Sequence, residues 1–124
     1  MEKHIEEIIR KMVFLPVEFD KGGKSEVSIL EDSGYFSEHH KISADEIKEV
    51  LGTAPDLIAE WLKFSDDSRS SRRWMFSRST NGLYTVGFWP DNKEYENLMT
   101  PDGFYACAVF IKRKAEFTRN LFNK

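Results

Sequence analysis

The strongest fold signal in the chain is the run from Ser77 to Pro90, SRSTNGLYTVGFWP. At its centre, Asn81-Gly82 separates two runs of β-prone residues, and Asn-Gly in this setting is a strong short-range signal for a β-hairpin. The first run extends back to Trp74 and the second ends at Trp89. The sequence therefore predicts two antiparallel strands with a tryptophan near each open end.

The turn permits two registers. With a two-residue loop, Trp74 would oppose Trp89 and the aromatic residues would be split between both faces. If Gly82 is instead the left-handed residue after a type I turn, Ser79 opposes Leu83. One face then collects Trp74, Phe76, Arg78, Tyr84, Val86 and Phe88. A slip of one residue would move this whole set to the other face, so we expect the second register.

That register separates the two tryptophans. Trp74 belongs to the core, while Trp89 lies on the opposite face, across from Arg73. A cation over an exposed indole contributes about 0.5–1 kcal/mol, which can hold a side chain but not a fold. Trp89 is therefore a candidate contact residue, unless another element of the chain covers this second face.

Upstream of the hairpin, the sequence predicts helices of uneven clarity. The apolar spacing of Ile5, Ile8, Ile9 and Met12 predicts an amphipathic helix over 2–13. Pro16 ends it, and we expect an extended segment at 15–20, a short strand at 26–30 and a loop at 31–41. Ser43 and Glu46 form a capping box inside an Ile42/Ile47 hydrophobic staple, which predicts a helix from Ala44 to Gly52. Pro55 then begins a second helix that carries the broad apolar stripe of Leu57, Ile58, Trp61, Leu62 and Phe64.

Downstream of the hairpin, residues 91–103 read as an irregular acidic connection. Thr100-Pro101-Asp102 is a helix-start signal, and the helix that follows presents Ala106, Phe110, Phe117 and Leu121 on one side, broadened by Cys107, Ile111 and Thr118. Residues 104–111 are also β-prone, so a strand there remains an alternative. The element order predicts one α+β domain over 1–124, with an antiparallel hairpin or short sheet packed against about four helices.

Composition limits the class of protein. The chain has 124 residues, of which 40% are hydrophobic and 14% aromatic. This composition predicts an ordered core. No apolar run approaches the roughly 20 residues of a membrane span, and the start, MEKHIEEIIRK, is too charged for a signal peptide. The single cysteine excludes an internal disulfide. These features predict a cytoplasmic protein without membrane association.

The net charge of −3 hides an asymmetry along the chain. Residues 1–68 hold 16 acidic and 8 basic side chains, whereas residues 69–124 hold 5 acidic and 10 basic side chains.

No catalytic or metal motif is evident. Adjacent residues of a strand point to opposite faces, so His39-His40 is poorly spaced for one metal and reads as a solvated loop pair. Cys107 lies in apolar YACAVF and reads as a buried core residue. The carboxylates look like surface acids, and there is no phosphate loop, Rossmann glycine pattern or GxSxG. We therefore expect no enzymatic activity and no cofactor.

The region 69–89 offers an alternative function. Arg69, Arg72, Arg73 and Arg78 are interleaved with Trp74 and Phe76, a composition found in nucleic-acid and small-ligand sites. The acidic chain and the expected burial of both aromatic residues argue against nucleic acid. A ligand-binding or nucleic-acid-binding domain built on 69–89 remains the alternative.

Three blocks carry a resemblance to a family. AEWLKFSDDSRSSRRWMF, YTVGFW and YACAVFIKRKAEF, within roughly residues 59–117, resemble small immunity proteins of bacterial polymorphic toxin systems, including contact-dependent growth inhibition. The resemblance implies a cytosolic protein that binds and neutralises a cognate toxin domain, often a nuclease, without catalysis or a cofactor.

The resemblance does not transfer contact residues, so the contact set comes from chemistry. A nuclease presents a basic substrate cleft, and acidic side chains can compete for it. We expect the toxin contacts at Asp66, Asp67, Trp89, Asp91, Glu94 and Glu96. The acidic faces of the first two predicted helices, with Glu6, Glu7 and Glu49, form the rival surface.

Overall fold

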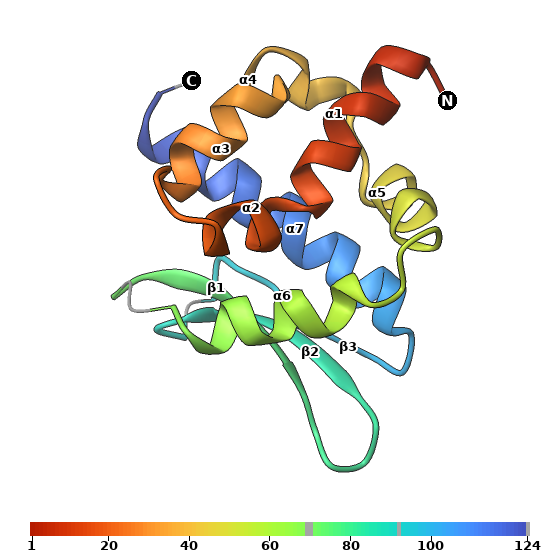
Figure 1. The fold of residues 1–124 in the computed structure, drawn as a ribbon. Helices are drawn as coiled ribbons and strands as arrows, with labels where there is room; N and C mark the ends of the chain where they lie inside the picture. Colours follow the sequence, from red (N-terminus) through yellow and green to blue (C-terminus); the bar gives the residue numbers. More distant parts are fainter. Residues whose placement is uncertain (69–70, 92, 124) are drawn as a thin grey trace.

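The computed structural model describes residues 1–68, 71–91 and 93–123 as a small α+β domain, which confirms the predicted fold class (Figure 1). An N-terminal helical part is followed by a three-stranded antiparallel sheet and a long final helix. The elements are α1 (Lys3–Val13), α2 (Leu15–Asp20), α3 (Glu26–Ser33), α4 (Tyr35–Glu38), the 3₁₀ turn η1 (His39–Lys41), α5 (Ala44–Leu51), α6 (Leu57–Asp66), β1 (Arg73–Arg78), β2 (Tyr84–Trp89), β3 (Leu98–Thr100) and α7 (Gly103–Leu121).

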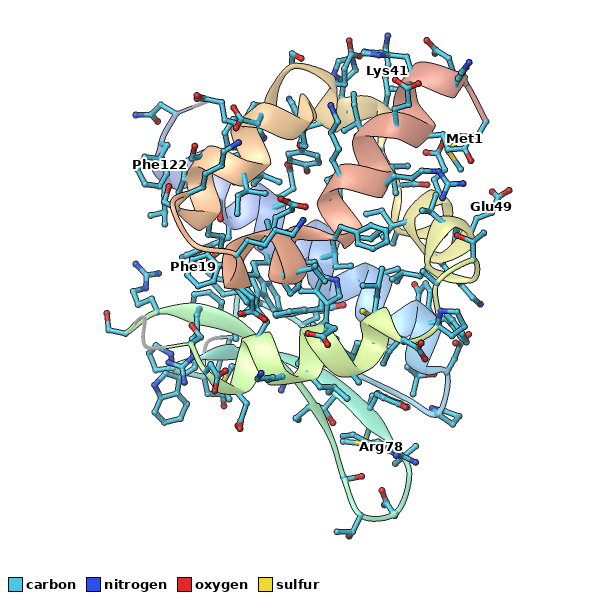
Figure 2. All side chains as sticks on the ribbon, viewed as in Figure 1. Met1, Phe19, Lys41, Glu49, Arg78 and Phe122 are labelled. Carbon is cyan, nitrogen blue, oxygen red and sulfur yellow. The ribbon has the colours of Figure 1, made fainter. Side chains whose placement is uncertain are left out.

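The hairpin of β1 and β2 has the predicted register. Trp74 lies opposite Phe88, and Phe76 lies opposite Val86. The Ser79 N–H donates to the Leu83 carbonyl at 2.8 Å. Gly82 has φ of +85°, a left-handed conformation that favours glycine. The turn projects from the rest of the molecule, and Arg78 marks its base (Figure 2). The sheet order is β1-β2-β3.

The third strand was not predicted. Leu98–Thr100 pairs antiparallel with 84–86 of β2, inside the segment that the sequence suggested was irregular. Three residues are too few to show an alternating pattern, so the partner strand determines this element and local sequence does not.

The final helix forms the centre of the core. α7 crosses the molecule between the sheet and the N-terminal helices, contacting α5, α6 and all three strands (Figure 1). The strand alternative for 104–111 is therefore wrong, because this segment is helical and Ala106–Ile111 is buried. The Asp102 carboxylate caps the helix by accepting from the Tyr105 N–H. Leu121 was expected on the buried face but is 62% exposed, because none of the described elements covers this last turn.

Three further helical predictions are confirmed. α1 buries Ile5, Ile8, Ile9 and Met12, and α5 begins at Ala44 behind the complete Ser43/Glu46 capping box. α6 is helical as predicted but begins at Leu57, so Pro55 lies in the preceding turn and not in the first turn of the helix as expected. α6 also protects the edge of the sheet. The buried Ser65 hydroxyl accepts the Phe76 N–H at 2.8 Å, so this backbone donor of β1 is not left unpaired.

Residues 15–20, 26–33 and 35–41 are helical, which corrects the predictions of an extended segment, a strand and a loop. Pro16 lies in the first turn of α2, where its missing N–H is not needed. Ser25 caps α3 by accepting the Ser28 N–H, and Gly34, with φ of +91°, turns the chain from α3 into α4. These helices are short, and their apolar residues were too few to distinguish helix from strand.

None of the described helices has the length and apolar composition needed to cross a membrane.

Candidate functional site

The outer face of the sheet carries the exposed tryptophan. Trp89 is 54% exposed and lies opposite Arg73, as the register predicted. Met99 of β3 pairs with Thr85 and is 65% exposed. Because residues alternate along a strand, this pairing places Met99 on the same outer face as Trp89. Of the described helices in contact with the sheet, α7 packs on the inner face and α6 borders β1. The side chains of Trp89 and Met99 are thus not covered by these helices.

Part of this outer face is covered by the connection between β2 and β3. A side chain at Gly87 would meet the Asn97 amide, with its Cβ 2.9 Å from Asn97 Oδ1. The alternative that another element covers the second face therefore holds at Gly87 and fails at Trp89.

The acidic connection is held in place by contacts of Tyr95 and Glu96 with the core and with α7. Tyr95 packs on Phe88 with ring centroids 4.2 Å apart and on Trp74 at 5.4 Å, and the Arg113 guanidinium donates to the Glu96 carbonyl at 2.6 Å. The side chains of Asp91, Glu94 and Glu96 lie at exposed positions around this anchor. These three predicted contact residues therefore share one short surface segment that follows Trp89.

The other two predicted contact residues end α6. Asp66 and Asp67 are exposed, at the end of the sheet that carries Arg73 and Trp89 and away from the hairpin turn (Figure 1). Asp67 borders a hollow of about 310 Å³ between α2 and α6, beside Phe19, which is 43% exposed. The structure thus places Asp66 and Asp67 on a different element from the 91–96 group, at the same end of the sheet.

A second surface feature was not predicted. A groove of about 410 Å³ lies between the C-terminal half of α7, the start of β1 and Tyr95. Its lining combines charged, polar and apolar side chains: Arg72, Trp74, Tyr95, Lys112, Arg113, Glu116, Phe117, Asn120 and Leu121. The walls come from three separate parts of the chain, so no single stretch of sequence indicates the groove.

Next to the groove, a half-buried polar network joins α4 and η1 to α7. The hydroxyl of the buried Tyr35 donates to Glu116, and the Lys112 ammonium donates to that hydroxyl at 2.9 Å and to the His39 carbonyl at 2.8 Å. Arg119 donates to both Glu116 carboxylate oxygens at 3.0 Å. Burial alone would raise the pKa of Glu116, but these donors stabilise its charged form and lower the pKa.

The surroundings of the histidine pair and of the cysteine indicate neither a metal site nor a reactive thiol. His39 and His40 lie in η1 with their rings 5.4 Å apart, and burial together with nearby Arg119 lowers the pKa of His39. Within residues 1–68, 71–91 and 93–123, no group of His, Cys, Asp and Glu is arranged to hold a metal ion. Cys107 is fully buried as expected, and burial raises the pKa of its thiol.

The arginines of the 69–89 region do not form one cluster. Arg69 lies outside the described residues. Arg72 lies over the Phe88 ring and Arg78 over the Tyr84 ring, at opposite ends of β1. At the rise of an extended strand, six residues separate these two positions by about 20 Å. Trp74 and Phe76 are buried, as predicted. The stacking platform that a single nucleic-acid strand would need is therefore not exposed at these two residues.

No family model matches the chain, and neither the curated proteins nor the solved structures contain a significant match.

Proposed function

We propose that this protein is a cytoplasmic immunity protein that binds a cognate bacterial toxin domain, a nuclease, and neutralises it by covering its active site or substrate groove. The observation that carries the proposal is the exposure of Trp89 on a sheet face that the described helices leave open, followed directly by three exposed acids. The proposed activity is binding alone, without catalysis or a cofactor.

The chemistry of this surface suits such a partner. Interfaces enrich tryptophan because a large rigid side chain desolvates much area at little entropic cost, and a half-exposed Trp89 has that area available. Asp91, Glu94 and Glu96 are exposed in the segment that follows Trp89 in the chain, and their negative charge complements the basic cleft that a nuclease uses for its substrate. Asp66 and Asp67 add negative charge at the same end of the sheet.

The first experiment is co-expression with the toxin domain encoded directly upstream of this gene. We expect restored growth and a stable complex after purification. If the two proteins fail to associate at about micromolar concentration, or if the upstream gene encodes a metabolic enzyme, the immunity proposal is wrong.

The second experiment locates the contact surface. Charge reversal at Asp91, Glu94 and Glu96 should slow association, and Trp89→Ala should mainly speed dissociation, both measured by surface plasmon resonance. The matched control reverses Glu6, Glu7 and Glu49, three acids on α1 and α5, of which Glu49 lies on the outer surface of α5 (Figure 2). If the control set weakens binding and the 91–96 set does not, the contact surface is on α1 and α5.

A further inference from the structure

We propose that the groove between α7 and the start of β1 binds a small organic anion with an aromatic body, of the aryl carboxylate or aryl phosphate class. The site lies on the opposite side of the sheet from Trp89 and does not depend on the immunity proposal. It develops the ligand-binding alternative for region 69–89, but most of its walls come from α7.

The charges of the groove favour an anion. Three cations, Arg72, Lys112 and Arg113, line it with one carboxylate, Glu116. That carboxylate already accepts from Arg119 and Tyr35, so little of its hydrogen-bonding capacity is left for the groove. The cations therefore exceed the negative charge available to balance them.

Two of these cations retain donor capacity. Neither Arg72 nor Arg113 forms an ion pair with a carboxylate among the described residues. Arg113 lies 4.9 Å from the Trp74 ring centroid and donates to one backbone carbonyl, and Arg72 lies 5.8 Å from the Phe88 ring centroid. A guanidinium has five N–H donors, so both can bind an oxyanion while keeping these contacts.

Lys112 would gain from an anion in the same place. Lys112 is half-buried, and that burial lowers its pKa, because the ammonium has lost part of its hydration. A bound carboxylate or phosphate would offset this cost, and the third ammonium N–H is available to it beside the donations to Tyr35 and His39.

The apolar part of the lining favours a ligand whose uncharged part is an aromatic ring. Phe117 and Tyr95 are half-buried in the groove wall, and Leu121, 62% exposed, forms one end. The α7 residues of the lining run from Lys112 to Leu121, nine residue steps or about 14 Å along a helix. Arg113 already lies against the Trp74 ring, so the groove offers an apolar wall for one ring and not a stacking platform for successive bases.

The test uses the full chain and three small probes: phenyl phosphate, benzoate and the neutral benzyl alcohol. In ¹H–¹⁵N NMR titrations, we expect saturable shifts at the amides of Arg72, Tyr95 and 112–121 with one or both anions, and no saturable shift with the alcohol. The tighter of the two anions identifies the head group. Absence of saturation with both anions up to about 10 mM, or equal binding of the alcohol, overturns the proposal.

A matched pair of variants assigns the binding to this groove. Arg72→Gln should weaken the better anion about tenfold or more, because a charge-assisted hydrogen bond is lost. Arg78→Gln is the control: Arg78 is also an exposed arginine over an aromatic ring, at the other end of β1 and outside the groove, so affinity should not change. Thermal melts establish that both variants fold. Equal effects of the two substitutions, or no effect of Arg72→Gln, overturn the proposal.

Discussion

Tyr35 links two distant parts of the chain through one hydroxyl. Its side chain is fully buried, and the hydroxyl contacts Glu116 and Lys112, which lie 81 and 77 positions away in the sequence. Burial of the ring is the largest cause of its raised pKa, followed by the Glu116 carboxylate. The raised pKa favours the protonated hydroxyl, which is the form that donates to Glu116.

Removing this hydroxyl should destabilise the domain. In Tyr35→Phe, Glu116 loses a donor and Lys112 an acceptor in a half-buried site, so we expect a loss of about 1–3 kcal/mol in the free energy of unfolding, measured by urea denaturation. The control is Tyr84→Phe, because the Tyr84 hydroxyl makes no hydrogen bond among the described residues, and it should change stability by less than about 0.5 kcal/mol. Equal stability of both variants and the wild type would show that the network contributes nothing.

At the level of single elements, α6 makes two contacts that stabilise the domain, one with the end of α1 and one with the edge of β1. Its apolar stripe buries Leu57 and Trp61, and the Trp61 indole N–H donates to the Val13 carbonyl at 2.9 Å, which joins α6 to the end of α1. Its last turn brings Ser65 to the edge of β1. A sheet edge left open is a site for pairing with another chain, and α6 borders this one.

The edge contact predicts the effect of a single substitution. Ser65→Ala leaves the buried Phe76 N–H without its acceptor, so we expect a loss of about 1–3 kcal/mol in urea denaturation. Ser37→Ala is the control, since Ser37 is exposed and donates only to the local Gly34 carbonyl. If the two variants are equally stable, water replaces the Ser65 hydroxyl and α6 does not protect the edge.

Across the domain as a whole, α7 connects the helical part to the sheet. It contacts the sheet on one side and α5 on the other, so the two parts of the domain share one core. Cys107 lies in the middle of this contact with no exposed surface. Burial disfavours its thiolate, which is the reactive form.

Thiol labelling can therefore test whether the helical part and the sheet unfold together. In the native protein, we expect Cys107 to react with a disulfide reagent only through global unfolding, so the free energy of opening from the labelling rate should equal that from urea denaturation. A much smaller opening free energy would mean that the helical part and the sheet separate before the domain unfolds.

Part of the candidate site follows from local sequence. The register argument predicted that Trp74 is buried and that Trp89 faces the other way, because a strand alternates strictly and an aromatic set on one face is decisive. The acids of 91–96 were expected at the surface from their type alone. The groove could not be predicted, since Arg72, Tyr95 and 112–121 are brought together only by the packing of α7 on the sheet.

The same division holds for the fold. α1, the capped start of α5, the hairpin and its register follow from the amino-acid sequence alone, because periodicity, a capping box and an Asn-Gly turn act over a few neighbouring residues. Tertiary packing was needed to make 15–20, 26–33 and 35–41 helical, to make Leu98–Thr100 a strand and to bring Tyr35 to Glu116. Segments this short or this distant gain too little from local interactions to select a conformation, so packing on α1, β2 and α7 selects it for them.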